Sequence, residues 1–212
     1  MVKKMMWAIL FLFCLSMTLF PIMYANHGEC FFIPNECEQG QSLSASSAVP
    51  VTTLGSLIVS GAWAYLDSYS CFLDYLKNYE TGRSDQKDSL VKAYEKITAA
   101  DAVYKKLIEE AAGFTYNDTA VDRLKQFDYD SYARTFDPGP RVFTQVRVLL
   151  EKGDVRGVFQ EISRRIRAIA DNLEPQVMNG IPGTGDLWRL SQAYAETLLF
   201  GQYAAEIFDR CR

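Results

Sequence analysis

Histidine is nearly absent from this chain of 212 residues, in which His27 is the only one. A serine triad needs a histidine as its base, and His27 lies near the N-terminus, where we expect no rigid support for a catalytic group. Helical di-iron proteins need Glu-x-x-His pairs, and the chain contains none. Met178 is the only methionine after residue 25 and no Cys-x-x-Cys-His motif occurs, which excludes the usual haem ligands.

Alternating runs typical of strands are also lacking, so no glycine-rich phosphate loop can follow a strand. Acidic residues are plentiful, but those on expected helices fall on polar faces or at helix starts, with Asp101 as the exception. These positions are typical of a solvated surface rather than of a catalytic carboxylate pair. We therefore expect no catalytic residues, no metal site and no cofactor.

A basic surface is lacking as well. The formal net charge is −4, and it falls further without the first 25 residues, whose only charges are Lys3 and Lys4. Nucleic-acid binding needs a basic surface that displaces counterions, so we expect no nucleic-acid partner. With 49% hydrophobic residues, the chain can bury a sizeable core and predicts one folded domain.

Residues 1–25 have the pattern of a secretory signal peptide, because Lys3 and Lys4 precede an uncharged apolar run that ends at Ala25. This pattern predicts export to the periplasm or the cell exterior. Met23 is larger than the small residue preferred before a cleavage site, and the apolar run is long enough to span a bilayer. An uncleaved membrane anchor is therefore the alternative, and we expect membrane contact only through this segment.

Four cysteines follow residue 25, and an even number in an oxidising compartment predicts two disulfides. Cys30 and Cys37 are spaced too widely for a typical zinc pair. Proximity along the chain favours Cys30 with Cys37, which leaves Cys71 for Cys211. In an antiparallel bundle those last two would lie about 25 Å apart, and Cys211 would instead reach Cys30 or Cys37. The sequence leaves both pairings open.

Residues 26–53 divide into the cysteine loop CFFIPNEC and the small, polar stretch EQGQSLSASSAVPVTT, which predicts a flexible linker. Phe31, Phe32 and Ile33 make the loop apolar. These side chains either pack on the rest of the protein or form an exposed contact site. We expect the remaining residues, 54–212, to form the helical domain.

Apolar residues recur at intervals of three and four over residues 54–79, which predicts one long buried helix. Similar patterns predict five more helical segments: from a cap at Ser84 or Asp85 to Ala112, over residues 119–136, from Pro140 to Gly153-Asp154, from Val155 through Leu173, and from Asp186 through Phe208. The Gly153-Asp154 pair is either a tight turn or a kink within one long helix.

These lengths predict an all-α, four-helix-bundle-like fold with one or two extra short helices. Three helices are long, the two segments around Gly153 form a broken fourth, and residues 119–136 form a crossover piece. The alternative is an α-hairpin repeat, because LLEKGDVRGVFQEI and LLFGQYAAEIF each resemble the second half of a tetratricopeptide hairpin. Their glycines, Gly153 and Gly201, are spaced more widely than the usual ~34 residues.

Tyrosines recur along the expected helices, and their hydroxyls could line a ligand site in the bundle core. The candidate ligand-lining residues are Tyr65, Tyr69, Tyr94 and Tyr104. The alternative is that each ring packs at the margin of the core with its hydroxyl in water.

Residues 141–167 are rich in arginine within an acidic chain. Arg164 and Arg167 share a helical face, whereas Arg165 lies nearer the apolar line. That face either contacts an anionic partner or is simply solvated.

Taken together, these patterns predict an exported helical protein that acts by binding or in an envelope assembly, without catalytic activity. The alternative is a periplasmic sensor or carrier that holds a small ligand in its bundle core. Its partner would then be the ligand rather than another envelope protein.

Overall fold

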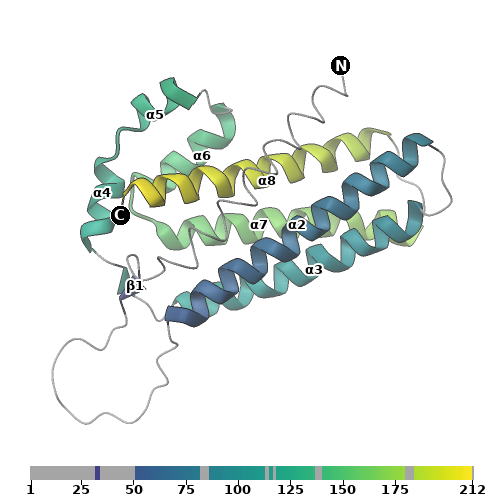
Figure 1. Ribbon diagram of the computed structural model, residues 1–212, viewed down its shortest axis with the longest axis horizontal. Coiled ribbons are helices and arrows are strands. Elements are labelled where there is room, and N and C mark those ends of the chain that lie inside the picture. The colour runs from purple at the N-terminus through teal and green to yellow at the C-terminus, as the bar shows by residue number, and fades with distance from the viewer. Residues whose placement is uncertain are drawn as a thin grey trace, which may run out of the picture.

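Four long helices surround one core in the computed structural model, which describes residues 32–33, 51–81, 86–112, 115–116, 118–136, 140–179 and 184–211. The long helices are α2 (Val51–Thr81), α3 (Gln86–Ala111), α7 (Val155–Asn179) and α8 (Thr184–Arg210). Each runs opposite to the one before it (Figure 1). Close packing joins α2 to α3, α3 to α7, and α7 to α8. The predicted all-α, four-helix-bundle-like fold is therefore confirmed.

The buried faces follow the spacing that predicted the helices. On α2, the side chains of Ile58, Tyr65, Tyr69 and Phe72 are all buried, and their intervals of seven, four and three residues place them on one face. The other three long helices bury equivalent stripes, which meet in a single hydrophobic cluster. One bundle closed around one core replaces the alternative of stacked tetratricopeptide-like hairpins.

Three short helices connect α3 to α7 and lie at the end of the bundle where α3 stops (Figure 1). They are α4 (Asp118–Gln126), α5 (Tyr129–Phe136) and α6 (Pro140–Leu150). The sequence predicted a single helix over residues 119–136, but Phe127 and Asp128 interrupt it. The Asp128 carboxylate accepts a hydrogen bond from the backbone N–H of Ser131 (2.8 Å) and so caps the new helix.

The Gly153-Asp154 pair is a tight turn rather than a kink. Gly153 has a φ of 70°, and its N–H and that of Asp154 bond to the carbonyls of Leu150 and Leu149, both at 2.9 Å. This is the Schellman arrangement that ends a helix. As a result α6 packs on α8, and α7 alone is the fourth bundle helix. The predicted broken fourth helix is therefore wrong.

Within the described residues, the β structure consists of one antiparallel pair of two-residue strands. Strand β1 (Phe32–Ile33) pairs with β2 (Thr115–Tyr116), with Phe32 opposite Tyr116. The sequence predicted no strands, because two residues are too short to show an alternating pattern.

The bundle begins at Val51, three residues before the predicted start. The expected signal peptide, and all of residues 26–53 except Phe32, Ile33 and the first turn of α2, lie outside the described residues. Among the helices that the structure describes, none has the length and apolar character needed to cross a membrane.

Candidate functional site

A small pocket lies in the part of the core shared by the first half of α2 and the second half of α8. Its walls include Ile58 and Ala62 of α2, Tyr104 of α3, Ile162 of α7 and Gly201 of α8, so all four long helices contribute. The cavity measures about 60 Å³, which is room for about four to six water-sized groups. None of the side chains that line it carries a charge.

Aromatic rings beside the pocket hold α2 and α8 apart. The ring of Tyr194 on α8 stacks on Tyr69 and on Phe72 of α2, each with ring centroids 5.1 Å apart. Farther toward the C-terminus of α8, the residues that line the pocket include three small ones, Gly201, Ala204 and Ala205. Because a helix is stiff, the spacing set by the rings persists to this end, where small side chains cannot fill it. The pocket is the space that remains.

On the other side of the pocket, α2 and α3 approach each other closely at Gly61. A Cβ atom added to Gly61 would lie 2.8 Å from Cε2 of Tyr104 and 3.3 Å from Cγ1 of Val103. Only glycine allows this approach. The ring of Tyr104 therefore lies across the backbone of α2 and forms part of the pocket wall.

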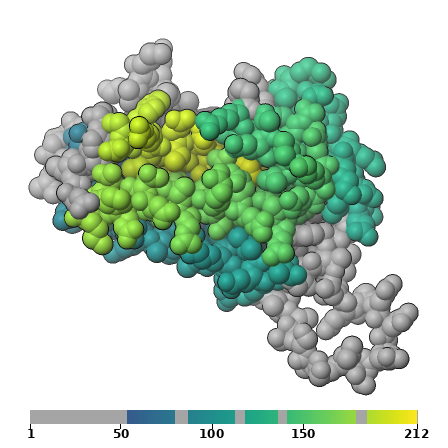
Figure 2. Space-filling view, turned by 180° about the vertical axis from the view of Figure 1, so that it is seen from behind, coloured from purple at the N-terminus to yellow at the C-terminus, as the bar shows by residue number. Residues whose placement is uncertain are grey.

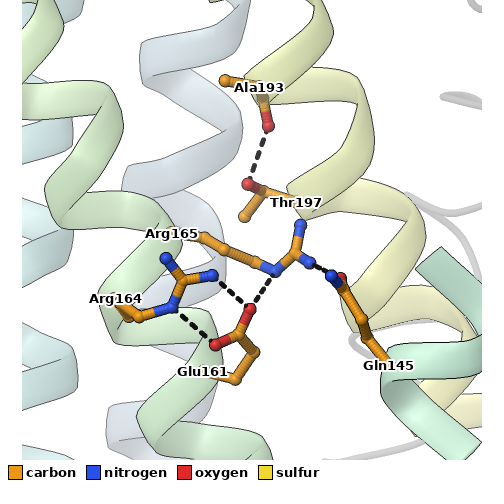
Figure 3. Close-up of polar contacts among 6 residues, drawn as sticks. All are labelled: Gln145, Glu161, Arg164, Arg165, Ala193 and Thr197. Carbon is orange, nitrogen blue, oxygen red and sulfur yellow. Dashed lines mark hydrogen bonds and ion pairs between the residues drawn. The ribbon is translucent and has the colours of Figure 1, made fainter. Parts of the chain in front are cut away.

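The tyrosine hydroxyls at the closed end of the pocket are already hydrogen-bonded. The Tyr65 hydroxyl donates to the backbone carbonyl of Tyr194 (2.5 Å). Ser68 donates to the carbonyl of Ala93 (2.6 Å) and shares a hydrogen bond with the Tyr194 hydroxyl (2.7 Å). Thr197, which also lines the pocket, donates to the carbonyl of Ala193 at 2.7 Å (Figure 3). These bonds satisfy buried polar groups and tie α2 to both α3 and α8.

Burial keeps the core tyrosines neutral. It is the largest cause that raises the pKa of Tyr65, with the neighbouring phenol of Tyr194 adding to it. Burial likewise raises the pKa of Tyr194, and the hydrogen bond with Ser68 opposes this only in part. A phenol with a raised pKa does not ionise near neutral pH, so neither group is suited to act as a general base.

Two of the four tyrosines predicted to line a ligand site lie in the pocket wall, and the other two do not. Tyr65 and Tyr104 line the pocket. Tyr69 stacks against Tyr194 beside it, and Tyr94 packs half-buried against the core from α3. Sequence reasoning missed the small residues that create the opening. A glycine in the middle of a helix, such as Gly201, makes the helix about 1 kcal/mol less stable than alanine would. A glycine at such a position is therefore a signal in the sequence that the site needs a small residue for packing or function.

Two arginines of the arginine-rich segment, Arg164 and Arg165, form a polar cluster with Glu161 on α7 (Figure 3). Arg164 forms two hydrogen bonds of 2.7 Å with the carboxylate of Glu161. Arg165 bonds to the same carboxylate (2.8 Å) and to the side chain of Gln145 on α6. Its guanidinium also lies 4.8 Å above the centre of the Phe200 ring on α8, within the range of a cation–π contact.

The two neighbouring arginines differ sharply in exposure. The side chain of Arg165 is 9% exposed and that of Arg164 is 65% exposed. Arg165 therefore joins α6, α7 and α8 from a buried position, in line with its place near the apolar line of the sequence. Arg164 is exposed but already paired, and Arg167 is exposed. Of the two predicted contacts for an anionic partner, Arg167 has the more accessible charge.

Of the two pairings that the sequence left open, Cys71 with Cys211 is not formed, because these two thiols are not bonded to each other. Cys71 lies close enough to influence the Tyr194 phenol, whereas Cys211 lies beside Tyr129. Tyr194 lies on α8 and Cys211 directly after it, about 25 Å farther along the helix axis. Cys71, which lies near Tyr194, is therefore too far from Cys211 for a disulfide. Burial raises the pKa of the Cys211 thiol to about 11, which makes it a poor nucleophile. Cys30 and Cys37 lie outside the described residues.

No group of three or more metal-ligating side chains occurs within the described ranges. Comparison with known proteins gives no match to a family model, to a curated protein or to a solved structure. Proposals about function therefore rest on the sequence and on the geometry described above.

Proposed function

We propose that this protein is an exported, non-catalytic binding protein that holds a small apolar ligand in its bundle core. The observation that carries this proposal is the pocket between α2 and α8, with uncharged walls from all four long helices. Ligand sites in helical bundles are built from side chains on facing helices, as this pocket is. The proposal follows the sequence-based alternative of a small-ligand sensor or carrier.

The chemistry of the walls favours binding over catalysis. Catalysis of proton transfer needs a group whose pKa lies near the working pH. The buried phenol of Tyr65 has a raised pKa, and no lining side chain is an acid, a base or a thiol. An apolar ligand, in contrast, gains free energy simply by leaving water.

Native mass spectrometry of the protein purified from its own host tests this proposal. We expect a bound small molecule that is released on unfolding. Stripping that molecule should lower the melting temperature, and adding it back should restore it, since a ligand that binds only the folded state stabilises that state. Protein that carries no small molecule and gains no stability from the host's apolar extract would contradict the proposal.

A role in an envelope assembly is the second candidate, and the far end of the bundle favours it. Met178 near the end of α7 and Trp188 near the start of α8 are 71% and 64% exposed. The ends of these helices lie together at one end of the bundle (Figure 1), and exposed apolar groups mark interfaces. A protein that co-purifies with the wild type but not with a Trp188→Lys variant would support this role.

The exported location is proposed from the N-terminal sequence. Cell fractionation should place the protein outside the cytoplasm, and sequencing of the mature N-terminus should begin at Asn26 after cleavage. Full-length protein in the membrane fraction would instead support the uncleaved anchor. A full-length cytoplasmic product would contradict export.

For the cysteines, we propose a disulfide from Cys211 to Cys30 or Cys37. Strand β1, which begins two residues after Cys30, and the end of α8 lie at the same end of the bundle (Figure 1). Cys71 would then remain a thiol unless a second molecule supplies its partner. Peptide mapping without reduction should find Cys211 linked to the N-terminal loop. A Cys71–Cys211 peptide would contradict both this pairing and the antiparallel bundle.

The anionic partner remains a proposal for Arg164 and Arg167. Because Glu161 already pairs with Arg164, Arg167→Glu should weaken such an association more than Arg164→Gln does. The association should also weaken with salt. Binding that survives both substitutions would leave the arginines as a solvated face.

A further inference from the structure

We infer that the pocket takes the end of one unbranched aliphatic chain, with the polar end of the same molecule left outside the bundle. This inference rests on the proposed function and names the class of ligand. The size of the cavity carries its first step. A cavity that holds benzene measures about 150 Å³, whereas this pocket measures about 60 Å³. A ring is too large, but a single file of about four to six carbons fits.

The hydrogen bonds of the walls carry the second step. Tyr65 and Thr197 line the pocket, and the hydroxyl of each already donates to a backbone carbonyl of α8. A polar group that entered would lose its water and find these donors occupied, which is costly. An aliphatic group needs no such partner. The part of the ligand inside the pocket is therefore hydrocarbon.

The openness of the pocket carries the third step. Ile162, Gly201 and Phe208 line the pocket and yet are only partly buried, so the cavity connects with the outside. A Cβ atom added to Gly201 would meet no atom of another helix within 4 Å. A chain end can therefore enter beside Gly201 while a head group stays in water. Figure 2 shows the opposite face, where α7 runs between α8 and α3 and covers the core.

Binding of straight-chain alcohols to the purified, ligand-stripped full-length chain tests the inference. Titrations followed by NMR would use 1-butanol through 1-decanol, with hexanoate and hexyltrimethylammonium as charged counterparts of 1-hexanol. Each added methylene should tighten binding about fourfold. The gain should stop after about four to six carbons, when the pocket is full. The two charged probes should bind alike, because no charged side chain lines the pocket.

Two substitutions fill the pocket from opposite sides. Gly201→Leu on α8 and Ala62→Leu on α2 should each weaken 1-hexanol binding at least tenfold, and circular dichroism would check that both variants fold. Gly185→Leu is the matched control, because Gly185 lies on the same helix, is exposed and has open space around it. It should bind like the wild type.

The chain could come from a free amphiphile or from a lipid in a membrane, and phosphatidylcholine vesicles separate the two. Flotation of the wild type with vesicles, lost in Gly201→Leu, would identify membrane lipid, whereas alcohol binding without flotation would identify a free amphiphile. Binding without chain-length dependence, or unchanged in both filled variants, would overturn the aliphatic-chain inference and leave the carrier proposal standing. Loss of all binding, together with a ligand-free protein from the host, would overturn both.

Discussion

Between α2 and α8, the half of the core around Tyr194 is filled by stacked rings, whereas the half around Gly201, where α8 also contributes Ala204 and Ala205, keeps an opening. The ring centroids of Tyr69 and Phe72 each lie 5.1 Å from that of Tyr194, while a Cβ atom added to Gly201 would meet no atom of another helix within 4 Å. The largest side chains in one part of a bundle thus determine how far apart the helices stay in another. The pocket depends on the aromatic half as much as on its own lining.

Truncating a ring in the filled half should have the largest effect. Tyr194 is fully buried, and Tyr194→Ala should lower the free energy of unfolding by about 3–5 kcal/mol, as loss of a large buried ring does. Phe208→Ala, in the open half, should cost less, because Phe208 is only partly buried and already borders empty space. Urea unfolding of both variants measures the difference. Equal losses would contradict the contrast between the two halves.

The sequence predicted the filled half far better than the open half. Spacing of apolar residues placed Tyr65, Tyr69 and Phe72 on one face of one helix, because burial of a stripe needs only the 3.6-residue period. The opening depends on which residues of α2 and α8 meet across the core, and a single helix pattern carries no such information. Whether Gly153 forms a turn or a kink was also left open by the sequence, because a glycine permits a turn without requiring one. The packing of α6 against α8 and α7, rather than in line with α7, followed from that turn and could not be predicted.

Two adjacent arginines on α7 give a second comparison, between a buried and an exposed side chain of the same type. Arg165 is buried against Phe200, one residue before Gly201, whereas Arg164 is exposed, and both pair with Glu161. Arg165→Ala should cost about 2–3 kcal/mol, less than a full loss of a buried pair because Glu161 keeps Arg164. Arg164→Ala should cost less than about 1 kcal/mol. Thermal unfolding compares them, and a larger loss for Arg164 would show that exposure does not decide the effect.

The two glycines on either side of the pocket should respond in opposite directions to a larger side chain. Gly61→Leu drives atoms into Tyr104 and Val103 and should lower stability by about 1–3 kcal/mol. Gly201→Leu fills space and should raise stability by about 0.5–2 kcal/mol. Melting temperatures would show the opposite signs. A loss in both variants would mean that the space beside Gly201 is not available to a side chain.

The smallest expected effect is a dependence of stability on pH. It should arise from the charged cluster around Glu161 and not from the uncharged pocket. Burial opposes ionisation of Glu161, but the hydrogen bonds and charges of Arg164 and Arg165 outweigh it and lower its pKa below the ordinary 4.5. A lowered pKa stabilises the folded state above the ordinary value, and this stability is lost as the pH falls through the lowered one.

Glu161→Gln should therefore reduce stability by about 1 kcal/mol or less near pH 7, since the cluster is partly exposed. The difference from wild type should shrink as the pH falls below 4.5. Gly201→Leu, which changes only the uncharged pocket, should keep the same stability difference across this range, and Glu109→Gln, at an exposed site on α3, controls for loss of a carboxylate. Denaturant unfolding at pH 7 and at steps down to about pH 3 measures all three, on either side of the ordinary glutamate pKa.

A Glu161→Gln difference that grows as the pH falls would contradict the assigned ion pairs. A Gly201→Leu difference that varies with pH would place a titrating group against the pocket wall, where the structure shows only uncharged side chains.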